Sequence, residues 1–183
     1  MNHAFTLFAG GSAGVWRVTS MRTLCGNPLP EVSHIAISRA TTMPSPQSSP
    51  WPLIGVASHA RYVQKAERAA LSGRQLGLGR LEATSAALIP IAKSQAWWDL
   101  TQEERREIFE TRSRHIAQSL AFMPAIQRQL FHCRDLGQPF DFLTWFEFAP
   151  SDAARFDDLV GILRETEEWR YVTREVDLRL TRE

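Results

Sequence analysis

The chain has 183 residues, of which 44% are hydrophobic, and it can therefore bury one core or the cores of two small packed halves. Lysine and arginine total 21 against 20 for aspartate and glutamate, so no charge excess points to nucleic acid or an anionic membrane as partner. Two cysteines are too few for a disulfide framework, and neither a basic leader nor a run of 18 apolar residues occurs. We expect a cytoplasmic protein that binds neither nucleic acid nor membrane.

The first 80 residues show short strand patterns separated by turns. Prolines, serines and threonines crowd residues 41–52, which favours an extended loop, and residues 59–75 have the pattern of a helix. Strands are predicted at residues 5–9, 14–20, 32–38 and 53–56. We interpret residues 1–80 as a shortened ferredoxin-like half.

Residues 81–183 have a sharper pattern, in the order β-α-β-β-α-β. Thr101 and Glu104 have the spacing of a capping box, which predicts the start of a helix that runs to about residue 122. A second helix is predicted at residues 151–167, and strands are predicted at residues 87–93, 126–133, 140–148 and 174–180. This order predicts a complete ferredoxin-like βαββαβ unit. The predicted fold class is α+β, with the two halves packed as one compact subunit.

His115 lies among apolar side chains of the helix predicted at residues 101–122. A histidine there is either a hydrogen-bonded core residue or a metal ligand, and neutral imidazole is a common axial ligand of haem iron. The second ring nitrogen of such a ligand usually bonds to a carboxylate. Glu168 is a candidate for that partner, and spacing alone leaves Glu165 and Glu167 as rivals.

Arg128 shares one face of its predicted strand with Leu130 and His132. An arginine on such a face extends to water at the sheet rim, or it meets an anion or a water-filled pocket, because desolvating it is costly. Together with His115 from the helix side, Arg128 can enclose a flat cofactor between a metal ligand and a fixed cation. The pair therefore predicts a haem enzyme that acts on a small anion.

Three stretches of the chain resemble the chlorite dismutase family, which are haem b proteins of dimeric α+β barrel fold. These stretches are ALIPIAKSQAWWDLTQEERREIF, SRHIAQSLAFMPAIQRQLFHCRDLGQPFDFLTWFEF and LRETEEWRYVTREVDLRL. The resemblance extends to GVASHARYV and LGLGRLEAT in the first half. The short first half is similar to the compact, dimeric branch of the family. The resemblance thus implies a ferredoxin-like dimeric α+β barrel and a homodimer.

The resemblance also implies roles for individual residues. His115 matches the proximal iron ligand, Glu168 the carboxylate bonded to it, Lys93 a lysine that completes this network, and Arg128 the catalytic distal arginine. The remaining matches are to residues near the haem or in the distal pocket: Trp97, Leu130, Thr144 and Phe146. On composition alone, Trp97 and Trp98 are equally typical of a core or a dimer interface.

The implied activity is the haem b-dependent decomposition of chlorite to chloride and dioxygen, with oxygen–oxygen bond formation in a distal pocket gated by Arg128. Alternatives are a coproheme decarboxylase-like protein, a haem-binding or transfer protein, and a weak peroxidase. Arg128 and the short first half argue against the decarboxylase. No distal histidine accompanies Arg128 in the pattern, which argues against strong peroxidase activity.

Overall fold

The structure is a computed structural model that describes residues 5–45, 49–57, 69 and 76–183. Apart from residue 69, the helix predicted at residues 59–75 lies outside the described residues. None of the described helices is long and apolar enough to cross a membrane.

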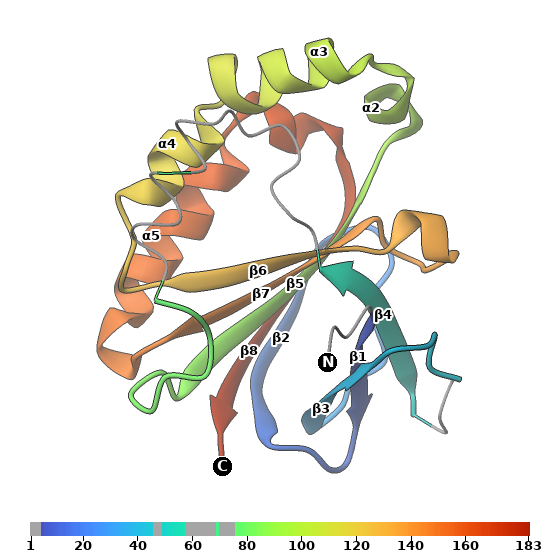
Figure 1. The fold of residues 1–183 in the computed structure, drawn as a ribbon, viewed down its shortest axis with the longest axis vertical. Coiled ribbons are helices and arrows are strands. Elements are labelled where there is room, and N and C mark those ends of the chain that lie inside the picture. Colours follow the sequence, from blue (N-terminus) through green and yellow to red (C-terminus); the bar gives the residue numbers. More distant parts are fainter. Residues whose placement is uncertain (1–4, 46–48, 58–68, 70–75) are drawn as a thin grey trace.

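The described residues contain eight strands, which close into one antiparallel barrel (Figure 1). Around the barrel their order is β1-β3-β2-β8-β5-β7-β6-β4, and β4 pairs again with β1. The strands are β1 (Phe5–Gly11), β2 (Trp16–Cys25), β3 (His34–Ala40), β4 (Trp51–Ala57), β5 (Ser85–Lys93), β6 (Gln127–His132), β7 (Phe142–Phe148) and β8 (Val172–Arg182).

The predicted fold class is wrong. Instead of a ferredoxin-like α+β unit beside a shortened copy, strands from both parts of the chain share a single closed barrel. The physical reason lies in the edges, because β6 and β8 would expose unpaired backbone groups if the second part stood alone. β2 pairs with β8 from Trp16 to Cys25, which covers that edge, and β4 pairs with the end of β6 at two positions, which closes the ring.

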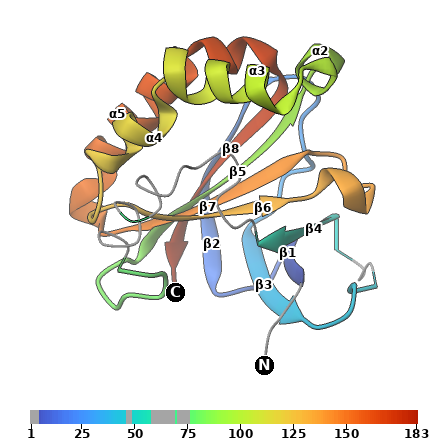
Figure 2. The same cartoon turned by 45° about the horizontal axis from the view of Figure 1, so that its top comes forward.

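The helices lie together over one side of the barrel, beside β5, β6, β7 and β8 (Figure 2). They are α2 (Gln95–Asp99), α3 (Gln102–Arg106), α4 (His115–Leu120) and α5 (Ala153–Arg164), and a π-helical segment, Glu107–Arg112, follows α3. The Thr101 hydroxyl accepts from the Glu104 N–H at 3.2 Å and the Glu104 carboxylate accepts from the Thr101 N–H at 2.7 Å, so the predicted capping box is confirmed.

The prediction of a single helix over residues 101–122 is wrong, because the helix is interrupted before α4. Arg114 has a φ of 50°, in the left-handed region that a regular helix does not contain. α2 was not predicted at all. The spacing of apolar residues along the sequence shows neither the break at Arg114 nor α2.

Two apolar cores result from the alternation of side chains along the strands. Inside the barrel, Leu88, Phe131, Trp145 and Leu178 belong to one buried cluster. On the outer face, a second cluster fills the layer between the sheet and the helices, and its members are Ala87, Ile89, Ile91, Ile126, Phe142, Phe146, Phe148, Phe156, Leu159, Val160 and Leu163. The candidate site lies in this outer layer.

Candidate functional site

A pocket partly open to solvent lies between the helices and the outer face of the sheet, with about 460 Å³ of space when the solvent at its mouth is included. Most of its lining is apolar. The lining residues are Ile89, Ile91, His115, Ser119, Arg128, Thr144, Phe146, Val160, Leu163, Arg164, Trp169 and Glu175. The walls thus combine an apolar surface with one histidine and a small number of charged groups.

His115 enters the pocket from the helix side as the first residue of α4. Two side chains fix the chain there: the Glu110 carboxylate accepts from the Ile116 N–H at 2.7 Å, and the Phe109 ring stacks on the imidazole at a centroid distance of 4.5 Å. His115 Nδ1 lies 3.0 Å from Oε2 of Glu168. When Nδ1 donates this bond, Nε2 keeps the lone pair that a metal requires.

Glu168 connects His115 to Lys93 in a buried chain of polar groups. Its Oε1 accepts from Lys93 Nζ at 2.5 Å, and both side chains are less than a tenth exposed. Burial alone raises the pKa of Glu168, but the charges of Lys93 and His115 and their hydrogen bonds outweigh it and hold the pKa at about 2. Burial lowers the pKa of Lys93, against the opposing charge of Glu168. Glu168 is therefore ionised at neutral pH.

The rival carboxylates lie elsewhere. Glu165 is exposed at the end of α5, and Glu167 pairs with Arg112 at 2.9 Å. The geometry thus selects Glu168 among the three candidates as the partner of His115.

Arg128 enters the pocket from the sheet side, on β6. In the β6–β7 ladder it lies opposite Phe146, and Leu130 lies opposite Thr144. Arg128, Thr144 and Phe146 line the pocket, whereas Leu130 packs against the outer cluster and is not among the lining residues. Burial lowers the pKa of Arg128, and the carboxylate of Glu168 opposes this effect across the pocket. An arginine remains a cation under such conditions because its ordinary pKa is above 12.

Trp97 lies behind the pocket. Lys93 Nζ lies 3.3 Å from the centroid of the Trp97 ring, and Tyr171 packs edge-on against that ring at 5.4 Å. Trp97 is thus in contact with the Lys93–Glu168 pair rather than among the pocket-lining residues. Its neighbour Trp98 stacks on Phe142 at 5.8 Å.

Eight lining residues were not predicted as site residues. Four of them are aliphatic, namely Ile89, Ile91, Val160 and Leu163, and the other four are Ser119, Arg164, Trp169 and Glu175. A signal for Glu175 is present in the sequence, because Glu175, Asp177 and Arg179 alternate with apolar residues and so place charges on one face of β8. α5 covers that face, which turns a solvent-facing pattern into a buried polar one. No local signal distinguishes Ser119 or Trp169.

The residues of the pocket fit a haem. A haem needs apolar surroundings for its ring, a ligand nitrogen for its iron, and partners for the polar groups at its rim. The outer apolar cluster supplies the surroundings. His115 supplies the nitrogen, and its bond to Glu168 sets which ring nitrogen is free to bind iron. The buried Ser119 Oγ has no hydrogen-bond partner among the described residues, which leaves one polar atom of the wall for a bound molecule.

Known proteins share this sequence and this fold. The family model described as chlorite dismutase matches residues 32–183. A chlorite dismutase from Ideonella dechloratans is 30% identical over 129 residues, which is 67% of this chain and only 41% of that relative. The match therefore spans less than half of the curated relative.

The structural comparisons agree with the sequence comparisons. A dimeric chlorite dismutase from Nitrobacter winogradskyi is 61% identical and has a TM-score of 0.91, with coverage of 97% of this chain and 99% of that one. A variant chlorite dismutase from Candidatus Nitrospira defluvii, crystallised with cyanide, is 19% identical and has a TM-score of 0.73 over 100% of this chain and 92% of that one, which shows a shared fold.

Fold and site together define a closed β-barrel protein with a helix-covered pocket bordered by a histidine–carboxylate–lysine chain. The chain belongs to the chlorite dismutase family. The predicted family is thus confirmed.

Proposed function

We propose that this protein is a haem b-dependent chlorite dismutase that converts chlorite to chloride and dioxygen. The observation that carries the proposal is the pairing of His115, oriented by Glu168, with Arg128 in the wall of one apolar pocket. Family membership and the 61% identity to a dimeric chlorite dismutase support the same activity.

His115 would hold the haem iron through Nε2, with Glu168 and Lys93 behind it. A carboxylate that accepts from Nδ1 increases the electron donation of an imidazole ligand. The ionised Glu168, neutralised by Lys93, keeps that effect without leaving an unpaired charge in the apolar layer. Leu130, Thr144 and Phe146 would shape the side of the pocket on which chlorite binds.

When bound, haem b supplies the redox-active iron at which the chlorine–oxygen bond of chlorite breaks. Arg128 attracts the chlorite anion and orients it with several N–H donors. Because its charge persists, it also retains the chlorine oxyanion fragment until both oxygen atoms leave together as dioxygen. The balance is one chlorite ion in, one chloride ion and one dioxygen molecule out.

The test is an oxygen-electrode measurement on the haem-loaded protein with added chlorite. We expect one dioxygen per chlorite consumed. Haem binding without oxygen release would contradict the proposed reaction and favour a coproheme decarboxylase, a haem carrier or a weak peroxidase. Failure to bind haem would contradict the assignment of His115.

An Arg128→Ala variant tests the catalytic role. We expect haem binding to persist, while the number of turnovers before inactivation falls at least severalfold, because the chlorine oxyanion escapes and bleaches the cofactor. Trapping of hypochlorite during turnover measures that escape. Arg39→Ala, which removes an exposed arginine of β3, is the control and should match the wild-type protein. Equal turnover numbers in both variants would remove Arg128 from the mechanism.

We also propose that the chain forms a homodimer, supported by the dimeric relative, and that it acts in the cytoplasm. Light scattering on the purified protein measures the first, and localisation of the tagged protein in its native cells measures the second.

A further inference from the structure

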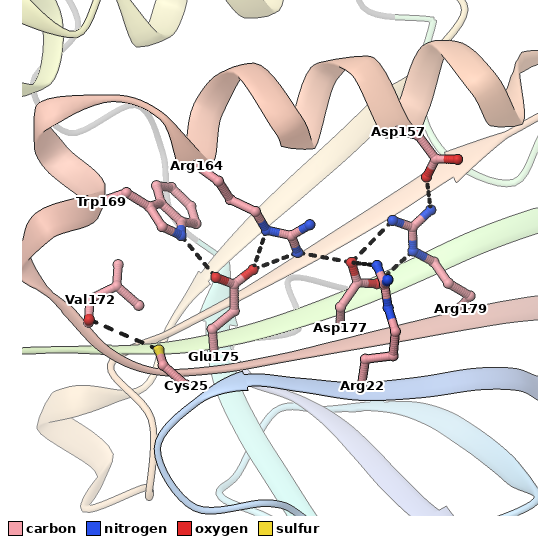
Figure 3. A network of polar contacts seen from close by, with 9 residues as sticks. All are labelled: Arg22, Cys25, Asp157, Arg164, Trp169, Val172, Glu175, Asp177 and Arg179. Carbon is pink, nitrogen blue, oxygen red and sulfur yellow. Dashed lines mark hydrogen bonds and ion pairs between the residues drawn. The ribbon is translucent and has the colours of Figure 1, made fainter.

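A buried polar network lies under α5, on the outer face of β8, and one end of it forms part of the pocket wall (Figure 3). Glu175 is at that end and is 2% exposed. Its Oε1 accepts from Arg164 Nε at 2.8 Å and Nη2 at 2.6 Å, and its Oε2 accepts from Trp169 Nε1 at 2.8 Å. Both carboxylate oxygens therefore accept hydrogen bonds, and these bonds fix the orientation of the Glu175 carboxylate.

The rest of the network braces Arg164. Its Nη2 also donates to Asp177 at 2.8 Å, and Asp177 in turn accepts from Arg179. Arg179 reaches Asp157, at the solvent end of the network, at 2.7 Å. The arginine that holds Glu175 is thus held by a second buried carboxylate, which leaves the Glu175 side chain little freedom.

Trp169 connects this network to the chain that orients His115. It directly follows Glu168 in a short 3-10 turn, Glu167–Tyr171. On one side, this turn is fixed to the π-helical segment and its end, since the Glu168 N–H donates to Ser113 Oγ at 3.2 Å and Arg112 donates to Glu167. The Glu168 carboxylate is also held by Lys93, and the Ser94 N–H donates to the Tyr171 carbonyl at 2.7 Å. Toward β8, the Trp169 indole connects the turn to Glu175.

We propose that Glu175 is a positioning residue for His115, acting through the Trp169 indole and the turn that carries Glu168. Glu175 does not touch His115. It fixes the orientation of the turn, and the turn places the Glu168 carboxylate at 3.0 Å from His115 Nδ1. Hydrogen-bond strength falls steeply with poor angles, so a small rotation of the turn weakens this bond. The inference rests on the proposed function in one respect, namely that His115 binds haem iron.

The first test reads the proton on His115 directly, in the full-length chain labelled with ¹⁵N-histidine at pH 8. Long-range proton–nitrogen NMR correlations distinguish a proton on Nδ1 from one on Nε2. We expect the wild-type protein to show the Nδ1–H form. Trp169→Phe keeps the ring and loses the N–H donor, and Glu175→Gln loses the charge, so both should shift His115 toward a mixture of the two tautomers. Glu168→Gln, which removes the carboxylate charge next to Nδ1, gives the reference for a directly weakened acceptor.

Asp157→Asn is the matched control, because it removes a carboxylate from the solvent end of the same network. It should keep the wild-type signal. If Glu175→Gln fails to fold, as judged by circular dichroism, Trp169→Phe decides. Wild-type His115 signals in a folded Trp169→Phe protein would overturn the proposal.

The second readout is the iron–histidine stretching frequency of the ferrous, haem-loaded protein. We expect it to fall in Trp169→Phe and Glu175→Gln, in the direction of Glu168→Gln and by less, and to stay unchanged in Asp157→Asn. An unchanged frequency in both variants would overturn the proposal. The failure of the proposed function is a different result, namely no dioxygen from chlorite in the wild-type protein, and the NMR comparison does not depend on it.

Discussion

His115 is the residue to which each part of the candidate site is connected. It is the first residue of α4, its Nδ1 bonds to Glu168, and its ring stacks on Phe109. The sequence predicted its place on an apolar face, whereas its partner Glu168 was separated from two rival acids only by family resemblance. The partner could not be derived from spacing, because 53 residues and a β-hairpin with a following helix separate the two side chains.

His115→Ala should lower the affinity for haem at least about 10-fold, since loss of an outer-shell partner alone typically costs 10–100-fold and this change removes the ligand itself. Spectroscopic titration with haem measures the effect. His34→Ala removes a histidine that bonds to Ser33 and Glu183 instead of the pocket residues, and it should titrate like the wild-type protein. Unaltered haem spectra in His115→Ala would refute the axial assignment.

Asp177 should make the stability of the protein depend on acid pH. Burial raises its pKa, but hydrogen bonds and charges of Arg179 and Arg164 outweigh this and hold the pKa below the ordinary value of 3.8. A lowered acid pKa stabilises the folded state above pH 3.8, and this contribution is lost as the pH falls toward the folded-state pKa.

Asp177→Asn should therefore reduce the free energy of unfolding by about 3 kcal/mol near neutral pH, because it breaks a buried ion pair. The difference in unfolding free energy between the wild-type protein and the variant should become smaller below about pH 4. Urea unfolding across this pH range measures both quantities. Asp158→Asn, on the exposed side of α5, is the control and should follow the wild-type curve. A pH-independent difference would show that Asp177 is not the titrating group.

At the scale of single elements, the strands and the helix at residues 151–167, observed as α5, were predicted well, whereas the segment from α2 to α4 was not. Period-two patterns placed the strands of both halves within a few residues of their observed bounds, because a buried sheet face imposes them locally. The break at Arg114 and the π-helical segment were missed. The start of α4 lacks a local side-chain cap, and the Glu110 carboxylate, from the preceding segment, accepts from N–H groups there instead.

Glu110→Ala should destabilise the protein by about 1 kcal/mol, which is the usual cost of losing a helix cap. Because His115 begins the helix that Glu110 caps, haem affinity should fall as well. Urea unfolding and haem titration measure the two effects. Glu103→Ala changes an exposed glutamate of α3 and serves as control. Equal stabilities of the two variants would show that the cap contributes nothing.

At the scale of the whole molecule, the sequence patterns did not predict that the strands close into one barrel. Each strand pattern shows which face is buried, but it does not show which distant strand will be its neighbour. Within the described residues, β4 and β6 pair at Val56–His132 and Ala57–Phe131 alone, and no local feature of either strand indicates this pairing. The predicted order of elements in residues 81–183 was therefore compatible with a self-contained unit that the molecule does not form.

The short pairing between β4 and β6, called the seam below, should be sensitive to the size of the side chains packed there. A Cβ at Gly55 would lie 2.6 Å from Phe131 Cβ and 3.1 Å from Cys133 Sγ, so Gly55→Ala forces the two strands apart. We expect a loss of about 1–3 kcal/mol in the free energy of unfolding, measured with urea. Gly161→Ala, where a Cβ meets nothing within 4 Å, should be neutral or stabilising. Equal effects in the two variants would show that the seam is loosely packed.

The position of the pocket outside the barrel sets the order in which the holoprotein can be assembled. The barrel interior is filled by its own side chains, including Phe8, Trp145 and Leu178, and none of them lines the pocket. The barrel can thus close without any group bound in the outer layer. We expect the proposed haem to bind to a barrel that is already closed, between its outer face and the helices that cover it.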